Sequence, residues 1–417
     1  MKKILLLFVF VSFYSCQQKT AGTKGSDVET SLKDSLNSAL KEVYKEGNFN
    51  GFGVAIANQD GVLYNEGIGY ANAERKEKYT RNTLQPIASI SKTFIGIALM
   101  KAQEMGKLKL DDPISKYLPF KVVNPAFPDV PITIRHLATH TSSITDTDFY
   151  LQKAWVLMDN VPVNGKFDYP QQFNLPSSKI AMEVFLRKIL VNGEEWYSKD
   201  GFVKHKPGAY YEYSNIGATL AAFVIEKAAG ECYDMFTAKY IIKPLRMDSS
   251  GWSYKDIDVS KRSMLYEMPG KVLPFYELIT YPDGGFITSA EDMGKYLCEL
   301  IKGFDGKGTL LEKESYKELF KQQLDKNNFS ERNEQNPYNE EYNTGLFMGF
   351  SYKGYVGHTG GDAGVVSMLF FDPKTKTGRF LMINTSFSTK AGNDQFYRIW
   401  DILGDYSKKL SVGNKKP

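Results

Sequence analysis

Segments with β-strand patterns lie near both ends of this chain, and the long stretch between them has helical patterns. Near the N-terminus, the β-prone runs 51–57 and 62–69 flank Asn58-Gln-Asp-Gly61, a turn sequence that predicts a hairpin. Toward the C-terminus, 345–351, 365–371 and 378–384 are further strand candidates. Because both groups need partners to bury their apolar faces, we expect them to meet. The prediction is a mixed α/β fold of the α+β type: an antiparallel sheet built from both chain ends, flanked by helices, with a mostly α-helical lobe inserted in its middle.

Helical periodicity supports this arrangement. The segment 28–44 carries apolar residues at helical spacing, and 94–105, 179–191, 218–229, 290–302 and 394–409 are further helix candidates. The helical lobe is expected over about 93–281. At 417 residues the chain could hold two or three average domains, but no repeat or low-complexity stretch divides it. We therefore expect one domain over 29–410, followed by a polar tail over 411–417.

The first sixteen residues have the pattern of an export signal. Lys2 and Lys3 precede the apolar run 4–11, which is too short to span a bilayer, and Ser15-Cys16 follows. A small residue just before a cysteine is what lipoprotein processing requires, because that cysteine becomes the lipid-bearing N-terminus. We interpret 1–16 as a lipoprotein-type signal peptide with Cys16 as the lipid anchor, and the polar stretch 17–28 as a flexible tether. The expected location is the cell envelope, in the periplasm or on the surface, with plain secretion as the alternative.

Composition argues against two other classes of function. Lysine plus arginine number 52 and aspartate plus glutamate 48, and the basic residues occur at most in pairs, so nucleic-acid binding is not expected. The four histidines form no ligand-spaced set with the cysteines, so no metal site is expected. Cys232 and Cys298 lie within the expected domain, where they could pair or could each be buried as a small apolar residue.

A serine and a lysine with catalytic spacing stand at the start of the predicted helix 94–105. Ser89 and Lys92 are three residues apart, so their side chains lie on one helix face and can touch. A partly desolvated lysine can be neutral enough to take a proton from the serine hydroxyl. The same spacing also occurs at Ser38 and Lys41, inside the first predicted helix, where no partner motif accompanies it.

Two later motifs supply further polar groups. Tyr213 and Asn215 form a Tyr-x-Asn pattern, in which a phenol near a lysine can relay a proton as a phenolate and an amide can contact a substrate. The only other copy, Tyr70-Ala-Asn72, precedes the serine in the chain. His358-Thr359-Gly360 occurs once, before the last strand pair, and suits binding of an extended acyl chain and its carboxylate along a sheet edge.

In this order, the three motifs resemble those of the serine β-lactamase and penicillin-binding protein superfamily, in particular its class C-like branch. That branch includes D-alanyl-D-alanine carboxypeptidases, D-aminopeptidases and esterases. The resemblance extends over about 35–384, because the phrases at 108–119, 132–142 and 283–286 also fit it. It implies a β-lactamase/transpeptidase-like fold and one catalytic domain.

The resemblance also implies the role of each site residue. Ser89 would be the acylated nucleophile, with Lys92 and Tyr213 as its proton-transfer partners. The substrate would be held by Asn215, His358, Thr359 and Gly360, and the oxyanion by the backbone N–H groups of Ser89 and Gly361. It implies no cofactor, and it implies a small-molecule or peptide substrate. The oligomeric state stays open.

Two departures from the family pattern bear on the substrate. Class C β-lactamases generally have lysine where this chain has His358, and a less charged ring should bind a carboxylate more weakly. We therefore expect hydrolysis of an ester or amide, either a D-amino-acid peptide or a small ester. The alternatives are a class C-like β-lactamase and a catalytically idle envelope protein that only binds its ligand. The long aromatic segment 146–207 could pack the helical lobe or could cap the cleft.

Overall fold

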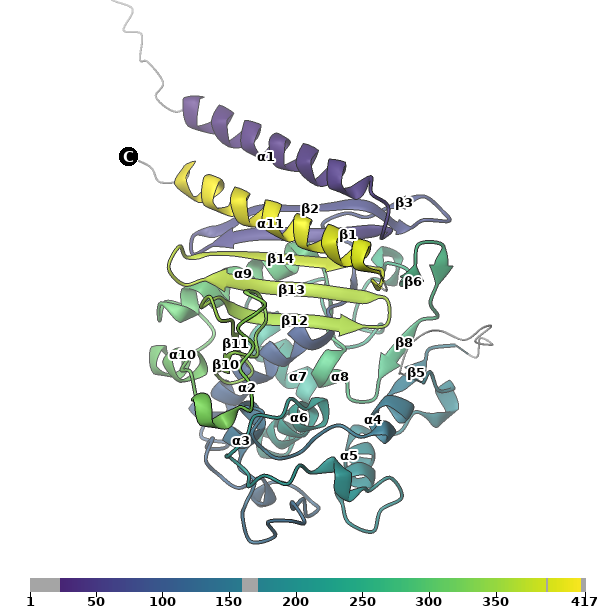
Figure 1. Cartoon of the computed structure of the whole chain (residues 1–417), viewed down its shortest axis with the longest axis vertical. Coiled ribbons are helices and arrows are strands. Elements are labelled where there is room, and N and C mark those ends of the chain that lie inside the picture. The colour runs from purple at the N-terminus through teal and green to yellow at the C-terminus, as the bar shows by residue number, and fades with distance from the viewer. Residues whose placement is uncertain (1–22, 160–171, 388, 414–417) are drawn as a thin grey trace, which may run out of the picture.

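An eight-stranded antiparallel sheet joins the two ends of the chain (Figure 1). The computed structural model describes residues 23–159, 172–387 and 389–413. The strand order is β10-β11-β12-β13-β14-β1-β2-β3. The bounds are β1 Gly51–Asn58, β2 Gly61–Asn72, β3 Glu77–Lys78, β10 Asn343–Thr344, β11 Gly349–Phe350, β12 Val356–Asp362, β13 Val365–Asp372 and β14 Thr377–Ile383. The prediction of a sheet built from both chain ends is confirmed.

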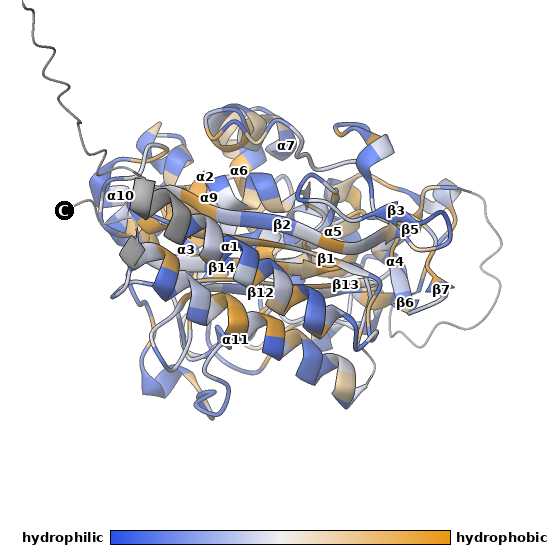
Figure 2. Ribbon diagram, turned by 90° about the horizontal axis from the view of Figure 1, so that it is seen from above, coloured by the Kyte–Doolittle hydropathy of each residue, from blue (hydrophilic) through white to orange (hydrophobic). Residues whose placement is uncertain are grey.

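The register of β1 against β14 explains why the two ends meet. Phe52 pairs with Ile383 and Val54 with Leu381, and all four side chains lie in one apolar cluster with the helices α1 (Thr23–Tyr44) and α11 (Lys390–Gly413). The next residue along β1, Ala55, faces the opposite cluster, which contains residues of α9 (Ala290–Phe304). Since successive side chains alternate between the faces, β1 can be buried on both. Figure 2 shows α1 and α11 lying along one face of the sheet.

The mostly helical lobe lies between the two groups of strands, as predicted. Its helices are α2 Lys92–Glu104, α3 Ile134–Ala138, α4 Asp148–Lys153, α5 Met182–Leu190, α6 Asn215–Ala229, α7 Tyr233–Thr237 and α8 Tyr281–Gly284, followed by α9 and by α10 Lys313–Leu319. Short strand pairs join parts of the lobe: β4 Gln85–Pro86 with β9 Ile287–Thr288, β5 Trp155–Leu157 with β8 Tyr276–Leu278, and β6 Tyr266–Met268 with β7 Lys271–Val272. Sequence patterns did not predict these short pairs, because two or three residues carry no periodicity.

Both terminal helices are longer than expected. The helix α1 begins at Thr23, inside the segment predicted as tether, and α11 extends to Gly413, into the predicted polar tail. Once the apolar face of a helix is packed, each added residue gains a backbone hydrogen bond, which outweighs weak local propensity. The predicted signal peptide, Cys16 and the first part of the tether lie outside the described residues, as do residues 414–417.

The prediction of a strand over 345–351 is wrong for most of its length. Only Gly349 and Phe350 pair with β12 there, and residues 345–348 instead turn so that Phe347 adopts a left-handed φ of 53°. The turn carries Phe347 back to the lobe, where its N–H donates to Ala138 O at 2.8 Å. A tertiary contact therefore overrides the local β pattern.

No helix in the described ranges is both long enough and apolar enough to cross a bilayer. The same ranges contain no cluster of three or more histidine, cysteine or acidic side chains arranged to hold a metal ion. Cys232 is exposed and Cys298 is buried, and both thiols are free.

Candidate active site

Ser89 lies in a tight 3-10 turn, Ala88–Ser91, directly before α2. The preceding residue, Ala88, has a left-handed φ of 49°, a conformation that alanine adopts only when its surroundings impose it. Those surroundings are visible: Ile87 N donates to Phe286 O at 3.0 Å, and Ser367 Oγ on β13 donates to Ile87 O at 2.7 Å. The turn is therefore held between the sheet and the lobe, with the Ser89 side chain partly exposed.

Lys92 is fully buried beside Ser89. Its Nζ lies 2.9 Å from Ser89 Oγ, 2.7 Å from Asn215 Oδ1 and 2.6 Å from the backbone oxygen of Asp283. Burial lowers the pKa of Lys92 to about 8, although nearby carboxylates, Asp283 first among them, act in the opposite direction. The expectation that desolvation makes this lysine neutral enough to accept a proton is confirmed in direction, because a lower pKa leaves a larger share of Lys92 neutral near pH 7.

These three contacts suit a neutral amine better than an ammonium ion. The oxygens of Asn215 and Asp283 can only accept hydrogen bonds, whereas the Ser89 hydroxyl can also donate. When Lys92 loses a proton, its two remaining N–H groups satisfy the two carbonyl oxygens. Its lone pair is then directed at the Ser89 hydroxyl, 2.9 Å away. The geometry therefore orients Lys92 as a base for Ser89.

Tyr213 lies next to the same lysine. Its ring centroid is 5.2 Å from Lys92 Nζ and 6.1 Å from that of His358. Burial raises the pKa of Tyr213 well above its ordinary value, and a hydrogen bond with Ser89 offsets this only in part. The sequence-based suggestion of a readily formed phenolate is therefore wrong, because loss of hydration outweighs the nearby lysine. In the resting site Tyr213 is a neutral phenol that can donate a proton.

Asn215 begins α6, and its amide is engaged at both ends. Its Oδ1 accepts from Lys92, and its Nδ2 donates to Asp146 Oδ2 at 2.7 Å. Asp146 also accepts from the backbone N–H groups of Asn215 and Ile216, at 3.1 and 3.0 Å, which satisfies free donors at the helix N-terminus. These contacts let Asn215 orient Lys92, and its contact with substrate stays a prediction. No sequence motif marks Asp146, which lies in a loop.

His140 is a second residue that the sequence motifs did not reveal. It has a left-handed φ of 54°, and its ring stacks on Tyr213 with centroids 4.5 Å apart. Its Nδ1 accepts the backbone N–H of Ser214 at 3.2 Å. Burial lowers the pKa of His140 well below its ordinary value, so the ring is neutral. His140 therefore holds the Tyr213 segment in place without adding a charge.

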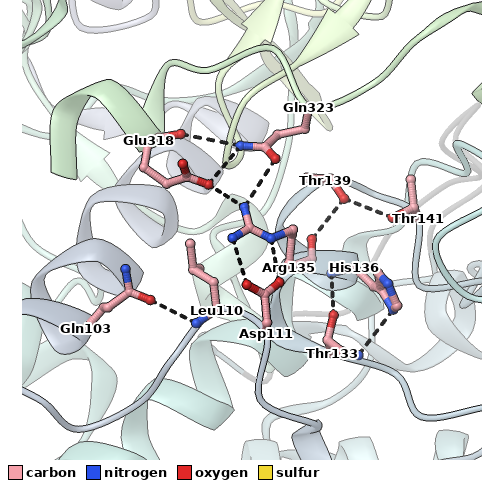
Figure 3. Close-up of polar contacts among 10 residues, drawn as sticks. All are labelled: Gln103, Leu110, Asp111, Thr133, Arg135, His136, Thr139, Thr141, Glu318 and Gln323. Atoms are coloured by element: carbon pink, nitrogen blue, oxygen red, sulfur yellow. Dashed lines mark hydrogen bonds and ion pairs between the residues drawn. The ribbon is translucent and has the colours of Figure 1, made fainter. Parts of the chain in front are cut away.

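A polar cluster around Arg135 anchors the segment that leads to His140 (Figure 3). Arg135 Nε donates to Asp111 Oδ1 at 2.7 Å, and its Nη1 pairs with Glu318 on α10. One turn later, Thr139 Oγ1 donates to the backbone oxygen of Arg135 at 2.8 Å. Because α3 has only five residues, these contacts rather than helix propensity fix its position.

The strand β12 forms the opposite wall of the site. His358 is buried, and its Nδ1 lies 2.6 Å from the backbone oxygen of Thr359, so this nitrogen carries the proton. Burial lowers the pKa of His358 from its usual value, although Glu340 acts to raise it. The hydroxyl of Thr359 donates to Glu340 Oε1 at 2.7 Å. Glu340 is a third site neighbour for which the sequence had no signal.

Gly360 allows β12 to approach the nucleophile turn. A Cβ at this position would lie 2.4 Å from Ile87 O and 3.2 Å from Ser89 N, so no larger residue fits. A Cβ on the next residue, Gly361, would meet nothing within 4 Å, and Gly361 is exposed. The backbone of β12 at Gly361 is thus free of side-chain contacts, one residue after the glycine that approaches the nucleophile turn.

Part of the aromatic segment 146–207 packs within the lobe, and part of it contacts β12. Trp155 on β5 donates from Nε1 to Asp362 Oδ1 on β12 at 2.9 Å, which ties the segment to the end of the cleft wall. Tyr150 donates to the Asp283 carboxylate, and Phe202 is buried in the main apolar cluster. Residues 160–171, with Phe167 and Tyr169, lie outside the described ranges.

The structure therefore brings Ser89, Lys92, Tyr213, Asn215 and the His358-Thr359-Gly360-Gly361 segment of β12 into one site. The second Ser-x-x-Lys copy lies in α1, on the other side of the sheet, where Ser38 Oγ is exposed and donates to Asp34 O at 2.9 Å. The second Tyr-x-Asn copy lies on β2, away from β12 in the strand order.

A family model described as Beta-lactamase matches residues 36–404. The chain belongs to the Beta-lactamase family. Membership of this family of serine hydrolases confirms the resemblance drawn from the three motifs. Protein flp of Staphylococcus aureus strain COL is 25% identical over 353 residues, which are 84% of this chain and 62% of that protein. Its counterpart in strain MW2 is 25% identical over 392 residues, covering 90% of this chain and 70% of that protein. This Beta-lactamase family chain thus spans under two thirds of the length of the COL protein.

Solved structures share the fold of this Beta-lactamase family member. A β-lactamase/D-alanine carboxypeptidase from Yersinia pestis superposes with a TM-score of 0.66 at 18% identity, covering 92% of this chain and 99% of that one. A D-amino acid amidase from Ochrobactrum anthropi SV3, complexed with D-phenylalanine, superposes with a TM-score of 0.64 at 19% identity, covering 90% and 99%. The predicted β-lactamase/transpeptidase-like fold is therefore confirmed.

Proposed function

We propose that this chain is a serine hydrolase that cleaves an ester or amide through an acyl-enzyme on Ser89. The observation that carries the proposal is the fully buried Lys92, whose lowered pKa and 2.9 Å contact make it a base for the Ser89 hydroxyl. The family match supports the reaction class, and the fold shared with a carboxypeptidase and an amidase is consistent with it.

Acylation begins with transfer of the Ser89 proton to neutral Lys92. Ser89 Oγ then bonds to the substrate carbonyl carbon, and the carbonyl oxygen becomes an oxyanion. We assign the backbone N–H groups of Ser89 and Gly361 as its donors, since Gly361 directly follows Gly360, where β12 approaches the nucleophile turn. When the intermediate collapses, the bond to the leaving group breaks, and the leaving group takes a proton from the Tyr213 phenol. Lys92 then returns a proton to Tyr213, whose ring centroid lies 5.2 Å from Lys92 Nζ.

Deacylation uses the same groups in reverse. A water molecule gives a proton to neutral Lys92, either directly or relayed by Tyr213, and its oxygen bonds to the acyl carbon. The carbon–Oγ bond breaks, a carboxylic acid is released, and Ser89 recovers its proton from Lys92. Asn215 keeps Lys92 in position throughout, because Asp146 fixes its amide.

For the substrate, we propose an ester or an amide such as a D-amino-acid peptide or a small ester. The buried, neutral His358 supports this over β-lactam hydrolysis, since it offers no fixed positive charge for a β-lactam carboxylate. Class C-like β-lactamase activity is the second candidate, favoured by the family match alone. An idle binding protein is disfavoured by a base already aligned on Ser89.

We further propose that the protein is exported and held at the cell envelope by a lipid on Cys16. The sequence pattern at 1–16 supports this, and residues 17–22 with the start of α1 would connect the anchor to the domain. Metabolic labelling of wild type and Cys16→Ala with a fatty-acid analogue tests it: label on both proteins, or on neither, would contradict the anchor.

One experiment tests the catalytic proposal against both alternatives. Purified protein is incubated with an activated ester, a D-amino-acid amide, a D-Ala-D-Ala peptide and a chromogenic cephalosporin, and Ser89 is probed with a fluorophosphonate followed by mass spectrometry. Ser89→Ala should abolish turnover and labelling, whereas Ser38→Ala, which alters the other Ser-x-x-Lys copy, should change neither. If no substrate turns over and no adduct forms on Ser89, the protein is not a hydrolase. Rapid turnover of the cephalosporin alone would make it a β-lactamase.

A further inference from the structure

The groups expected to bind a substrate carboxylate have no proton free to donate to one. The hydroxyl proton of Thr359 goes to Glu340 Oε1 at 2.7 Å. The proton on His358 Nδ1 is directed at the backbone oxygen of Thr359, so the neutral ring presents only a lone pair at Nε2. A carboxylate can only accept hydrogen bonds, and it therefore finds no side-chain donor at these two positions.

A carboxyl group, that of Glu340, also lies where a positive charge would be needed to bind a substrate carboxylate. Glu340 Oε1 lies 3.4 Å from His358 Nδ1 as well as 2.7 Å from the Thr359 hydroxyl. Its charge reaches the catalytic groups, because it contributes to raising the pKa of both Lys92 and Tyr213. A substrate carboxylate bound at Thr359 would lie next to a second negative charge.

Glu340 is built into this position. It is 8% exposed, and its Oε2 atom is buried with no hydrogen-bond partner among the described residues. A Cβ at Gly349 would lie 2.1 Å from Glu340 Cβ, so the glycine of β11 makes room for the side chain. A buried side chain held this closely has little freedom to swing away when substrate arrives.

We infer that the leaving group lies against β12, and that Glu340 is a specificity-determining residue that excludes leaving groups carrying a carboxylate and admits uncharged or cationic ones. The inference rests on the proposed function and narrows it. The preferred substrates are esters and amides that release an alcohol, ammonia or an amine. Peptides that end in a free carboxylate next to the scissile bond, and β-lactams with their ring carboxylate, are poor substrates for the same reason.

Two thioesters of one acyl group test this inference. One releases thioglycolate and the other mercaptoacetamide, which have nearly the same shape and differ in charge, and a thiol reagent measures both products. In wild type, kcat/KM for the mercaptoacetamide thioester divided by kcat/KM for the thioglycolate thioester should exceed the same ratio of the two uncatalysed hydrolysis rates. In Glu340→Gln, which keeps the size and an acceptor for Thr359, the kcat/KM ratio should shift toward thioglycolate by about tenfold or more.

The control variant is Glu341→Gln, which removes the same charge one residue away and should leave the ratio unchanged. An unchanged ratio in Glu340→Gln, or an equal fall with both thioesters, would overturn the inference, since the second result marks a merely positioning residue. Preference of the wild type for the thioglycolate ester would overturn it even if Glu340→Gln does not fold. Fluorophosphonate labelling of Ser89 separates the two proposals: labelling with the wrong ratio refutes only the inference, whereas no labelling and no turnover refute both.

Discussion

The ionisation of Lys92 predicts how activity depends on pH. Burial lowers the pKa of this lysine from 10.5 to about 8. At pH 7 about one molecule in eleven then carries neutral Lys92, compared with about one in 3,000 for an unperturbed lysine, a gain of about 300-fold in the active form. Because the neutral form is the base, kcat/KM should rise about tenfold per pH unit below pH 8 and level off above it.

The assay is kcat/KM for an activated ester between pH 5.5 and 9.5, at constant ionic strength. Lys92→Arg provides the comparison, because arginine keeps the positive charge but does not become neutral in this range. It should lose about 10²–10⁴-fold in rate above pH 8, where wild type is most active, and lose the inflection near 8. A flat wild-type profile, or an inflection near 8 that persists in Lys92→Arg, would show that Lys92 is not the base.

Three substitutions test the supports of the site. Gly360→Ala puts a Cβ 2.4 Å from two oxygen atoms, so it should lower kcat/KM by about 100-fold or more and lower the melting temperature. Gly361→Ala, whose Cβ meets nothing within 4 Å, should melt like wild type. Equal losses of melting temperature in the two variants would contradict this. Asp146→Ala removes the acceptor for the N-terminus of α6 and should cost about 1–2 kcal/mol in urea unfolding and lower kcat; unchanged stability would count against a capping role. Arg135→Met should cost about 1 kcal/mol of unfolding free energy, because its ion pairs are partly exposed, and an unaltered urea midpoint would show that the cluster is dispensable.

The sequence was sufficient for the architecture because each part of it rests on a local pattern. The hairpin turn at 58–61 and the alternation in β1 required strands, and the separation of strand patterns from helical patterns required an inserted lobe. Element ends were less certain. The residues 345–348 have a β pattern, but a contact between Phe347 and the lobe turns them away from the sheet, and no local pattern records such a contact.

The motifs predicted the reacting groups because the chemistry requires particular side chains in a particular order. Ser89, Lys92 and Tyr213 were assigned from the resemblance of the three motifs to those of the family, and their order with His358 set aside the second copies of the first two motifs. Their ionisation could not be read in the same way. Tyr213 was expected to form a phenolate readily, and its burial has the opposite effect.

What only the tertiary structure decided is how each of these groups is surrounded. Asp146 and Glu340 come from loops far away in the chain, and each changes the role of a motif residue: one turns Asn215 toward Lys92, and the other takes the proton of Thr359. Such contacts join residues separated by 69 and 19 positions and follow no period. The sequence thus predicted the class of reaction proposed for this protein, whereas burial and long-range hydrogen bonds decided the surroundings of its groups, from which their protonation and the proposed charge of the substrate follow.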